Sequence, residues 1–247
     1  PHSHGLQYNP MMGISAIITN FQGRDLVEQC VASLLREPLE PEIIVVDNAS
    51  TDGSVAALRR RFGRRVTVIA LEKNYGPARA WNIGAQAARG EYLLFLDNDT
   101  EVLPGTLAAI REGFAVDPNI GAMQCKLLFK ADKTRIDCVG DWLSPLGFLI
   151  QRAPVGTVDT GQYEAMVDIL AAKSAAMAVR TAAWRAAGGF DETYFQYVIE
   201  TDICWRIWLA GYRVVSCPGT AVLHVWGGTE RVLTNRYKRW NVKYQGA

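Results

Sequence analysis

Short apolar runs alternate with stretches of helical periodicity along the first half of the chain. Four runs predict strands: residues 14–19, 42–46 and 66–70 are rich in β-branched residues, and residues 92–96 are an unbroken apolar run. Three intervening segments repeat apolar residues at helical spacing and predict helices, at residues 25–37, 54–62 and 78–88. Asp25 is expected to cap the first helix. This alternation predicts an α/β fold with a mostly parallel central sheet flanked by helices.

The periodicity fades after about Lys130. Residues 140–161 contain four glycines and two prolines, so we expect a long, partly mobile loop region. A helix is predicted at residues 200–210, with Trp205 and Trp208 packed in the core. Two short strands are predicted beyond this helix, at residues 212–215 and 221–225.

The fourth apolar run ends abruptly at Asp97-Asn98-Asp99. An unbroken apolar run is typical of a strand buried on both faces, and open parallel sheets bind ligands beyond the carboxyl ends of such strands. Two carboxylates this close repel each other unless a cation lies between them, and Mg²⁺ or Mn²⁺ prefers oxygen ligands. The alternative is a polar turn at the strand end without a ligand.

Composition narrows the possible functions. The 247 residues carry a formal net charge of +1, which argues against a nucleic-acid binder held by a basic surface. No run of about 18 apolar residues predicts a membrane-spanning helix. The five cysteines form no C-x-x-C pair, which argues against a zinc site and favours small core residues in a reducing compartment. We therefore expect a cytoplasmic location.

Several motifs follow one another in a fixed order between residues 13 and 228. They are I-I-T-N at 17–20, I-V-V-D-N-A-S-T-D-G-S at 44–54, N-Y-G-P-A-R-A-W-N-I-G at 74–84, L-D-N-D at 96–99, G-G-F-D-E at 188–192, E-T-D-I-C-W-R at 200–206 and His224. This ordered set resembles the family 2 glycosyltransferases of the GT-A fold. The stretch L-D-N-D-T-E at 96–101 is similar to the rhamnosyltransferase-like and galactofuranosyltransferase-like branch.

The resemblance implies an inverting, metal-dependent transferase that uses Mn²⁺ or Mg²⁺. It implies a UDP- or dTDP-sugar donor and a saccharide or lipid-linked saccharide acceptor in surface polysaccharide synthesis. Within one Rossmann-like GT-A domain, residues 13–130 would form the nucleotide-sugar-binding half. Residues 131–228 would form a smaller acceptor-binding and catalytic half.

The resemblance also assigns site residues by position. The metal ligands would be Asp97, Asp99 and His224. The nucleotide-sugar contacts would be Thr19, Asn20, Phe21, Asp47, Asn48, Arg79, Asp97 and Asn98. The general base would be Glu200 or Asp202. Many relatives carry Glu-Asp-x-Asp there with the second residue as base, and Glu200 falls on that position in Ile199-Glu200-Thr201-Asp202.

Each assignment has a purely structural alternative. His224 would otherwise be a partly buried strand-end residue, and Asp47 would cap the turn to Ser50. Arg79 would be a solvated arginine in a first helical turn. Glu200 and Asp202 would only stabilise a helix N-terminus, where anionic side chains are favoured.

The two ends of the chain are interpreted separately. Residues 1–12 are expected to be a cloning scar or a disordered leader. Residues 229–247 are expected to form a basic and aromatic helix or tail. Within it, residues 231–243 suit either the anionic inner face of the cell membrane or a solvated helix face. Trp226 is a candidate platform for a sugar ring.

Two other function classes compete with a glycosyltransferase. A sugar-phosphate nucleotidyltransferase also uses strand-end carboxylates and a metal, but it requires a glycine-rich phosphate loop with Arg or Lys after the first strand. Residues 19–24 read T-N-F-Q-G-R, which argues against that loop. A non-catalytic carbohydrate-binding module with a transferase fold would not need the full acidic set with His224.

Overall fold

The computed structural model describes residues 13–195 and 198–225 of the chain. The strands are β1 (Ile14–Asn20), β2 (Glu42–Asp47), β3 (Thr67–Ala70), β4 (Tyr92–Asp97), β5 (Thr100–Val102), β6 (Ile120–Phe129), β7 (Ile136–Cys138), β8 (Asp141–Leu143), β9 (Leu149–Gln151), β10 (Ala176–Arg180) and β11 (Arg213–His224). The α-helices are α1 (Arg24–Leu34), α2 (Ser54–Phe62), α3 (Pro77–Ala87), α4 (Thr106–Val116), α5 (Thr181–Ala186) and α6 (Ile199–Leu209). A short 3₁₀ turn, Gly63–Arg65, follows α2.

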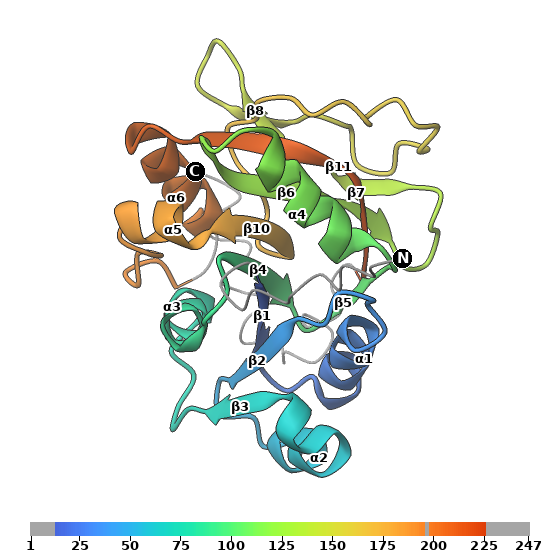
Figure 1. The fold of residues 1–247 in the computed structure, drawn as a ribbon, viewed down its shortest axis with the longest axis vertical. Helices are drawn as coiled ribbons and strands as arrows, with labels where there is room; N and C mark the ends of the chain where they lie inside the picture. The colour runs from blue at the N-terminus through green and yellow to red at the C-terminus, as the bar shows by residue number, and fades with distance from the viewer. Residues whose placement is uncertain (1–12, 196–197, 226–247) are drawn as a thin grey trace, which may run out of the picture.

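The main sheet of the described residues has the strand order β3-β2-β1-β4-β10-β6-β11-β5, with β7 paired to β6 (Figure 1). Strands β1 to β4 are parallel to their neighbours in this group, as expected for right-handed βαβ crossovers. Strand β10 runs antiparallel to both β4 and β6, and β5 runs antiparallel to β11. The predicted α/β class with a central sheet flanked by helices is therefore confirmed. The sheet is mixed, with its parallel pairs at β1 to β4 and between β6 and β11.

Helices cover both faces of this sheet, and the alternation along β4 shows how. Leu94 and Leu96 face the core cluster that contains apolar residues of α1, α2 and α4. Leu93 and Phe95 face the opposite cluster, built with α3, α5 and α6 (Figure 1). All four side chains are fully buried, which explains the uninterrupted apolar run.

Several predicted elements differ from the observed ones. Residues 140–161 are not a structureless loop, because β8 and β9 pair as a hairpin within them. The two short strands predicted after residue 211 form one strand, β11, which keeps its pairing to β6 across a register shift between Cys217 and Val222. A bulge of this kind absorbs the Pro218-Gly219 pair, which the pattern had suggested would separate two strands.

Two local predictions differ from the structure. Trp205 is 49% exposed, so it is not a core residue, whereas Trp208 is partly buried and donates its indole N–H to the Ile169 carbonyl at 3.1 Å. Asp25 lies inside the first turn of α1, and Gly23 occupies the N-cap position.

The expectation of buried cysteines is confirmed for all five. In the described part of the chain, no helix combines the length and apolar character needed to cross a bilayer.

Candidate active site

The acidic residues of the L-D-N-D motif lie where β4 ends and β5 begins. Asp97 is the last residue of β4, and the Thr100 hydroxyl donates a 2.7 Å hydrogen bond to its carbonyl, which closes the turn. Strand β5 then pairs with β11 so that Thr100 lies opposite His224. This pairing brings a histidine from the end of the described chain to the two carboxylates.

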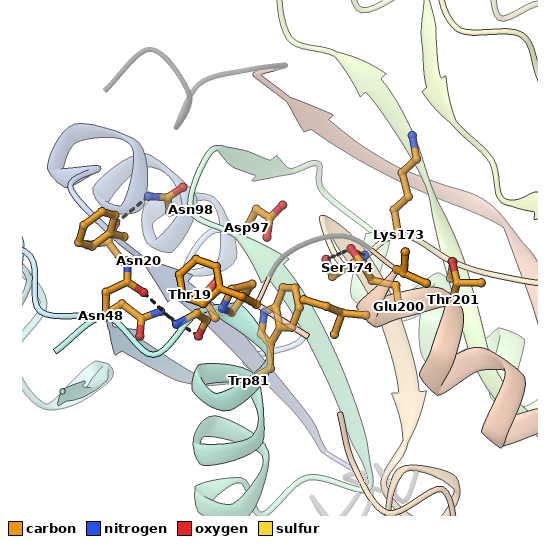
Figure 2. Close-up of a pocket in the computed structure, with 18 of the residues that line it drawn as sticks. Thr19, Asn20, Asn48, Trp81, Asp97, Asn98, Lys173, Ser174, Glu200 and Thr201 are labelled. Carbon is orange, nitrogen blue, oxygen red and sulfur yellow. Dashed lines mark hydrogen bonds between the residues drawn. The ribbon is translucent and has the colours of Figure 1, made fainter. Parts of the chain in front are cut away.

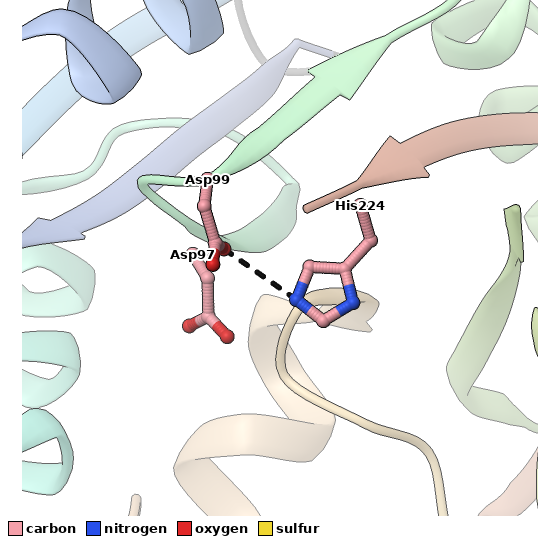
Figure 3. A group of neighbouring side chains, drawn as sticks. All are labelled: Asp97, Asp99 and His224. Carbon is pink, nitrogen blue, oxygen red and sulfur yellow. Dashed lines mark ion pairs between the residues drawn. The ribbon is translucent and has the colours of Figure 1, made fainter. Parts of the chain in front are cut away.

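Asp97, Asp99 and His224 form a compact cluster (Figure 3). One ligand atom from each residue lies within 4.8 Å of the others. The Asp99 Oδ1 atom is buried and has no hydrogen-bond partner in the described part of the chain, and His224 Nε2 lies 3.5 Å from it. Two carboxylates and an imidazole are a donor set that Mn²⁺ and Mg²⁺ accept, so these residues fit a divalent cation.

The electrostatics of this cluster favour bound positive charge. Burial, followed by the neighbouring Asp99 carboxylate, raises the pKa of Asp97 to about 7. Burial would lower the pKa of His224, but its contacts with Asp137 and Asp99 outweigh burial and raise that pKa to about 10. Both shifts favour the protonated forms of Asp97 and His224, which reduce the net negative charge of the cluster. A bound divalent cation would offset this negative charge in place of the protons.

A cavity of about 480 Å³ opens beside this cluster (Figure 2). Its lining joins the carboxyl ends of β1, β2 and β4 to the segment before β10 and the start of α6. Seven of the predicted site residues line it: six nucleotide-sugar contacts (Thr19, Asn20, Phe21, Asn48, Asp97 and Asn98) and one candidate base, Glu200. Residues that the sequence motifs indicated in distant segments therefore line one cavity.

Asn20 is the centre of a buried polar network where the carboxyl ends of β1 and β2 meet this cavity. Its amide nitrogen donates to Asp47 Oδ2 at 2.7 Å, and its amide oxygen accepts from Asn98 Nδ2 at 2.8 Å. The other Asp47 oxygen accepts the Ser50 amide at 2.8 Å, so Asp47 also caps the turn after β2. Gly23 leaves room for the Asn98 amide, because a Cβ at that position would collide with Asn98 Nδ2.

Two of the predicted nucleotide contacts lie outside the residues that line the cavity. Asp47 is buried beneath Asn20. Arg79 stacks its guanidinium on the Tyr75 ring, 4.1 Å from the ring centroid, and lies 3.9 Å from Glu192 Oε2. Nearly half of the Arg79 side chain is exposed, so its orientation matches the solvated alternative.

The two candidate bases have different surroundings. Glu200 lines the cavity, and its Oε1 accepts a 2.6 Å hydrogen bond from the Ser174 hydroxyl. Asp202 forms an ion pair with Arg206 one turn further along α6, with Arg206 Nε at 3.0 Å from Asp202 Oδ2. Residues two apart on a helix point in different directions, and Glu200 is the one directed toward the cavity.

Sequence reasoning missed four residues around the site. Asp141, Lys173 and Ser174 line the cavity, and Asp137 accepts a hydrogen bond from His224 at 2.7 Å. They lie on two short strands and in an irregular segment, where neither periodicity nor a motif singles them out. Trp226, the candidate sugar platform, and residues 229–247 lie outside the described residues.

Comparisons with known proteins agree with this geometry. The model for glycosyl transferase family 2 matches residues 15–154, and the model for glycosyl transferase family group 2 matches residues 92–247. The O-antigen biosynthesis protein RfbC of Myxococcus xanthus is 30% identical over 218 residues, which cover 85% of this chain. The matched region spans only 17% of RfbC, so this chain corresponds to a small part of that relative.

Solved glycosyltransferases share the fold at low sequence identity. GalNAc-T7, solved with UDP, GalNAc and Mn²⁺, gives a TM-score of 0.70 at 17% identity, over 87% of this chain and 44% of its own. The mannosyltransferase PcManGT from Pyrobaculum calidifontis, solved with GDP-Man and Mn²⁺, gives 0.65 at 20% identity, over 96% of this chain and 62% of its own. The fold is therefore GT-A, as predicted. Because the glycosyl transferase family 2 model matches more than half of the chain, the chain belongs to glycosyl transferase family 2.

Proposed function

We propose that this domain is an inverting glycosyltransferase that depends on Mn²⁺ or Mg²⁺. It would transfer a sugar from a UDP- or dTDP-sugar to a saccharide or lipid-linked saccharide in surface polysaccharide synthesis. The observation that carries the proposal is that one cavity adjoins a candidate cation site and is also lined by a carboxylate, Glu200, from a different element. Inversion requires a base at the acceptor hydroxyl as well as stabilisation of the leaving diphosphate, and the two groups supply these functions.

The cation would be held by Asp97, Asp99 and His224. When bound there, it supplies Lewis-acid stabilisation of the charge that develops on the leaving diphosphate. Asp97 also lines the cavity, so it connects the cation site with the substrate space. Support for Mn²⁺ comes from GalNAc-T7 and PcManGT, both of which were solved with this ion.

Glu200 would accept the proton of the acceptor hydroxyl as that oxygen attacks the sugar carbon. The Ser174 hydroxyl donates to Glu200 Oε1, which fixes the carboxylate and leaves Oε2 for the acceptor. Asp202 would have a positioning role, because its carboxylate is paired with Arg206. Arg206 Nη1 also donates to the Gly189 carbonyl at 2.7 Å, so this pair joins α6 to the G-G-F-D-E segment.

The nucleotide would occupy the side of the cavity lined by Thr19, Asn20, Phe21, Asn48 and Asn98. Asp47 would act here through Asn20, whose amide it orients, and through its remaining lone pairs, which are candidate acceptors for the N3–H of uracil or thymine. A guanine base offers a different pattern of donors, so the proposal favours UDP and dTDP. The GT-A fold itself does not decide the base, because PcManGT was solved with GDP-Man.

The wider assignments rest on the family and on the relatives. RfbC is named for O-antigen biosynthesis, which supports surface polysaccharide as the product. We also propose that residues 13–130 form the donor half and residues 131–228 the acceptor half. Contact of residues 231–243 with an anionic membrane, and with it a location at the inner face of the cell membrane, stays a prediction.

The test is a transfer assay with a panel of UDP-, dTDP- and GDP-sugars, with Mn²⁺ and with EDTA. We expect release of a nucleoside diphosphate from a UDP- or dTDP-sugar that stops when EDTA is added. In a parallel assay with added pyrophosphate, formation of a sugar 1-phosphate and a nucleoside triphosphate would instead identify a nucleotidyltransferase. Binding without turnover of any sugar nucleotide, with acceptor present, would favour a non-catalytic module.

A further inference from the structure

Asp137 is a buried acid on β7 with no assigned role in the proposed reaction. Only 3% of its surface is exposed, and its Oδ2 atom lies 2.7 Å from Nδ1 of His224. Its Oδ1 atom lies 4.0 Å from the ammonium of Lys173, which supplies the opposite charge. Strand β6 pairs with both β7 and β11, so the sheet itself places Asp137 and His224 close together.

The hydrogen bond of Asp137 determines how His224 presents its ring. An ionised carboxylate is only an acceptor, so Nδ1 of His224 must be the donor in this 2.7 Å contact. The other ring nitrogen, Nε2, then points toward Asp97 and Asp99 (Figure 3). In a neutral imidazole with a proton on Nδ1, the lone pair is on Nε2, which is the form that binds a metal.

We propose that Asp137 is a positioning residue for the cation site, where it holds His224 in the orientation and tautomer that direct the Nε2 lone pair toward the ion. This inference rests on the proposed metal dependence. Asp137 would act on a bound ion through His224, because Nδ1 of His224 contacts Asp137 and Nε2 faces Asp99. Partners of this kind typically contribute 10- to 100-fold to metal affinity.

A purely structural role is the alternative, since a buried pair between β7 and β11 also stabilises the sheet. The two roles differ in what they predict for the binding of Mn²⁺ alone. A positioning residue acts through His224, so its removal matters only while His224 is present. A structural residue would weaken Mn²⁺ binding whether or not His224 is there, by disturbing Asp97 and Asp99.

The experiment is a double-mutant cycle on Mn²⁺ affinity, measured by calorimetry or by the electron paramagnetic resonance of free Mn²⁺. We expect Asp137→Ala to weaken Mn²⁺ binding about 10- to 100-fold in the wild-type background and less than about twofold in the His224→Ala background. Asp137→Asn keeps the side-chain volume and an acceptor oxygen, so it should weaken Mn²⁺ binding less than Asp137→Ala does. It also serves as the second variant should Asp137→Ala not fold.

Glu37→Ala is the matched control, because Glu37 is also a buried acid but accepts the Leu107 amide rather than contacting the cluster. We expect it to bind Mn²⁺ within about twofold of the wild type. Wild-type-like affinity in Asp137→Ala, or an equal loss in both backgrounds, would overturn the inference while leaving metal dependence intact. Failure of the wild-type protein to bind Mn²⁺ would refute the proposed metal dependence, and the positioning role with it.

Discussion

The Ser174 hydroxyl donates a 2.6 Å hydrogen bond to Glu200 Oε1, which joins the segment before β10 to the first turn of α6. The bond fixes one oxygen of a carboxylate that lines the cavity. A carboxylate fixed in this way at a helix start is well placed to take a proton from a bound hydroxyl. The hydrogen bond therefore distinguishes Glu200 from its neighbour Asp202, whose charge is paired with Arg206.

We predict that Glu200→Gln lowers turnover by about 10²- to 10⁴-fold, the usual contribution of a general base. Affinity for the nucleoside diphosphate should stay within about twofold, because the amide keeps the volume of the side chain. Steady-state rates and calorimetry measure the two effects. Asp202→Asn is the comparison: near-wild-type turnover for Glu200→Gln together with a loss for Asp202→Asn, with both proteins folded, would reverse the two roles.

Ser174→Ala should have a smaller effect than Glu200→Gln. It removes a neutral donor to a charged group, a bond worth roughly 1.5–3 kcal/mol, so we expect turnover to fall by about tenfold or more. The loss should appear in kcat more than in the KM of the donor, since Ser174 fixes the proposed base. Unchanged kcat in this variant would show that the hydrogen bond does not position Glu200 for the reaction.

Asp99→Ala should abolish specific Mn²⁺ binding. The variant removes one of the two acidic ligands, including the buried Oδ1 atom that has no hydrogen-bond partner among the described residues. Transfer should then stay low at saturating Mn²⁺, whereas EDTA inhibition of the wild type should be reversed by Mn²⁺ or Mg²⁺. Full activity of Asp99→Ala at saturating metal would remove Asp99 from the ligand set.

Asp47→Ala should weaken UDP binding by about tenfold or more, because loss of a hydrogen bond to a charged group costs roughly 1.5–3 kcal/mol. Glu37→Ala is the control, since Glu37 is also a buried acid but accepts the Leu107 amide and does not line the cavity. It should bind UDP nearly as the wild type does. Tighter binding of GDP than of both UDP and dTDP by the wild type would contradict the base preference.

Much of the fold could be predicted because its signals are local. The apolar runs of β1, β2 and β4 identify buried strands without knowledge of their partners, and the turn residues mark where helices begin. The antiparallel direction of β10 could not be predicted, because strand pairing is set by residues far apart in the chain. The hairpin of β8 and β9 was missed because three-residue strands are too short to show an alternation.

The residues of the candidate site also differ in whether a local sequence signal could identify them. Asp97, Asp99 and Glu200 occupy motif positions, so their selection needed only the order of motifs. Asp137 lies in a three-residue strand, Ile136–Cys138, and its contact with His224 spans 87 residues of sequence. No local pattern encodes such a contact. Arg79 also occupies a motif position, but it does not line the cavity in the structure: its guanidinium stacks on Tyr75 and lies near Glu192.

The buried ammonium of Lys126 gives a prediction about stability and pH. It lies 2.9 Å from Asp159 Oδ2 and also contacts Glu164, which fastens the segment after β9 to β6. Burial would raise the pKa of Asp159, but the hydrogen bonds from Lys126 and the Gly161 amide lower it. We expect Lys126→Met to reduce the free energy of unfolding at pH 7 by about 1–3 kcal/mol.

The sign of the pH dependence follows from the lowered pKa of Asp159. A carboxyl whose pKa is lower in the folded protein stabilises the fold above its unfolded value of about 4, and this contribution is lost as the pH falls below that value. Urea unfolding from pH 6 to 3 should therefore show a steeper loss in the wild type than in Lys126→Met. Arg135→Met, which breaks an exposed pair with Asp132, should change the unfolding midpoint much less.

The position of β10 between β4 and β6 also has a consequence for how the chain is made. Strand β4 ends at Asp97, but its second partner begins only at Ala176, so about 80 further residues must be synthesised first. At about 5–20 residues per second, the ribosome needs roughly 4–16 s for that length. During this interval the nascent β1-to-β4 unit carries an open strand edge along the apolar residues 92–96, which is the kind of surface that chaperones shield from aggregation.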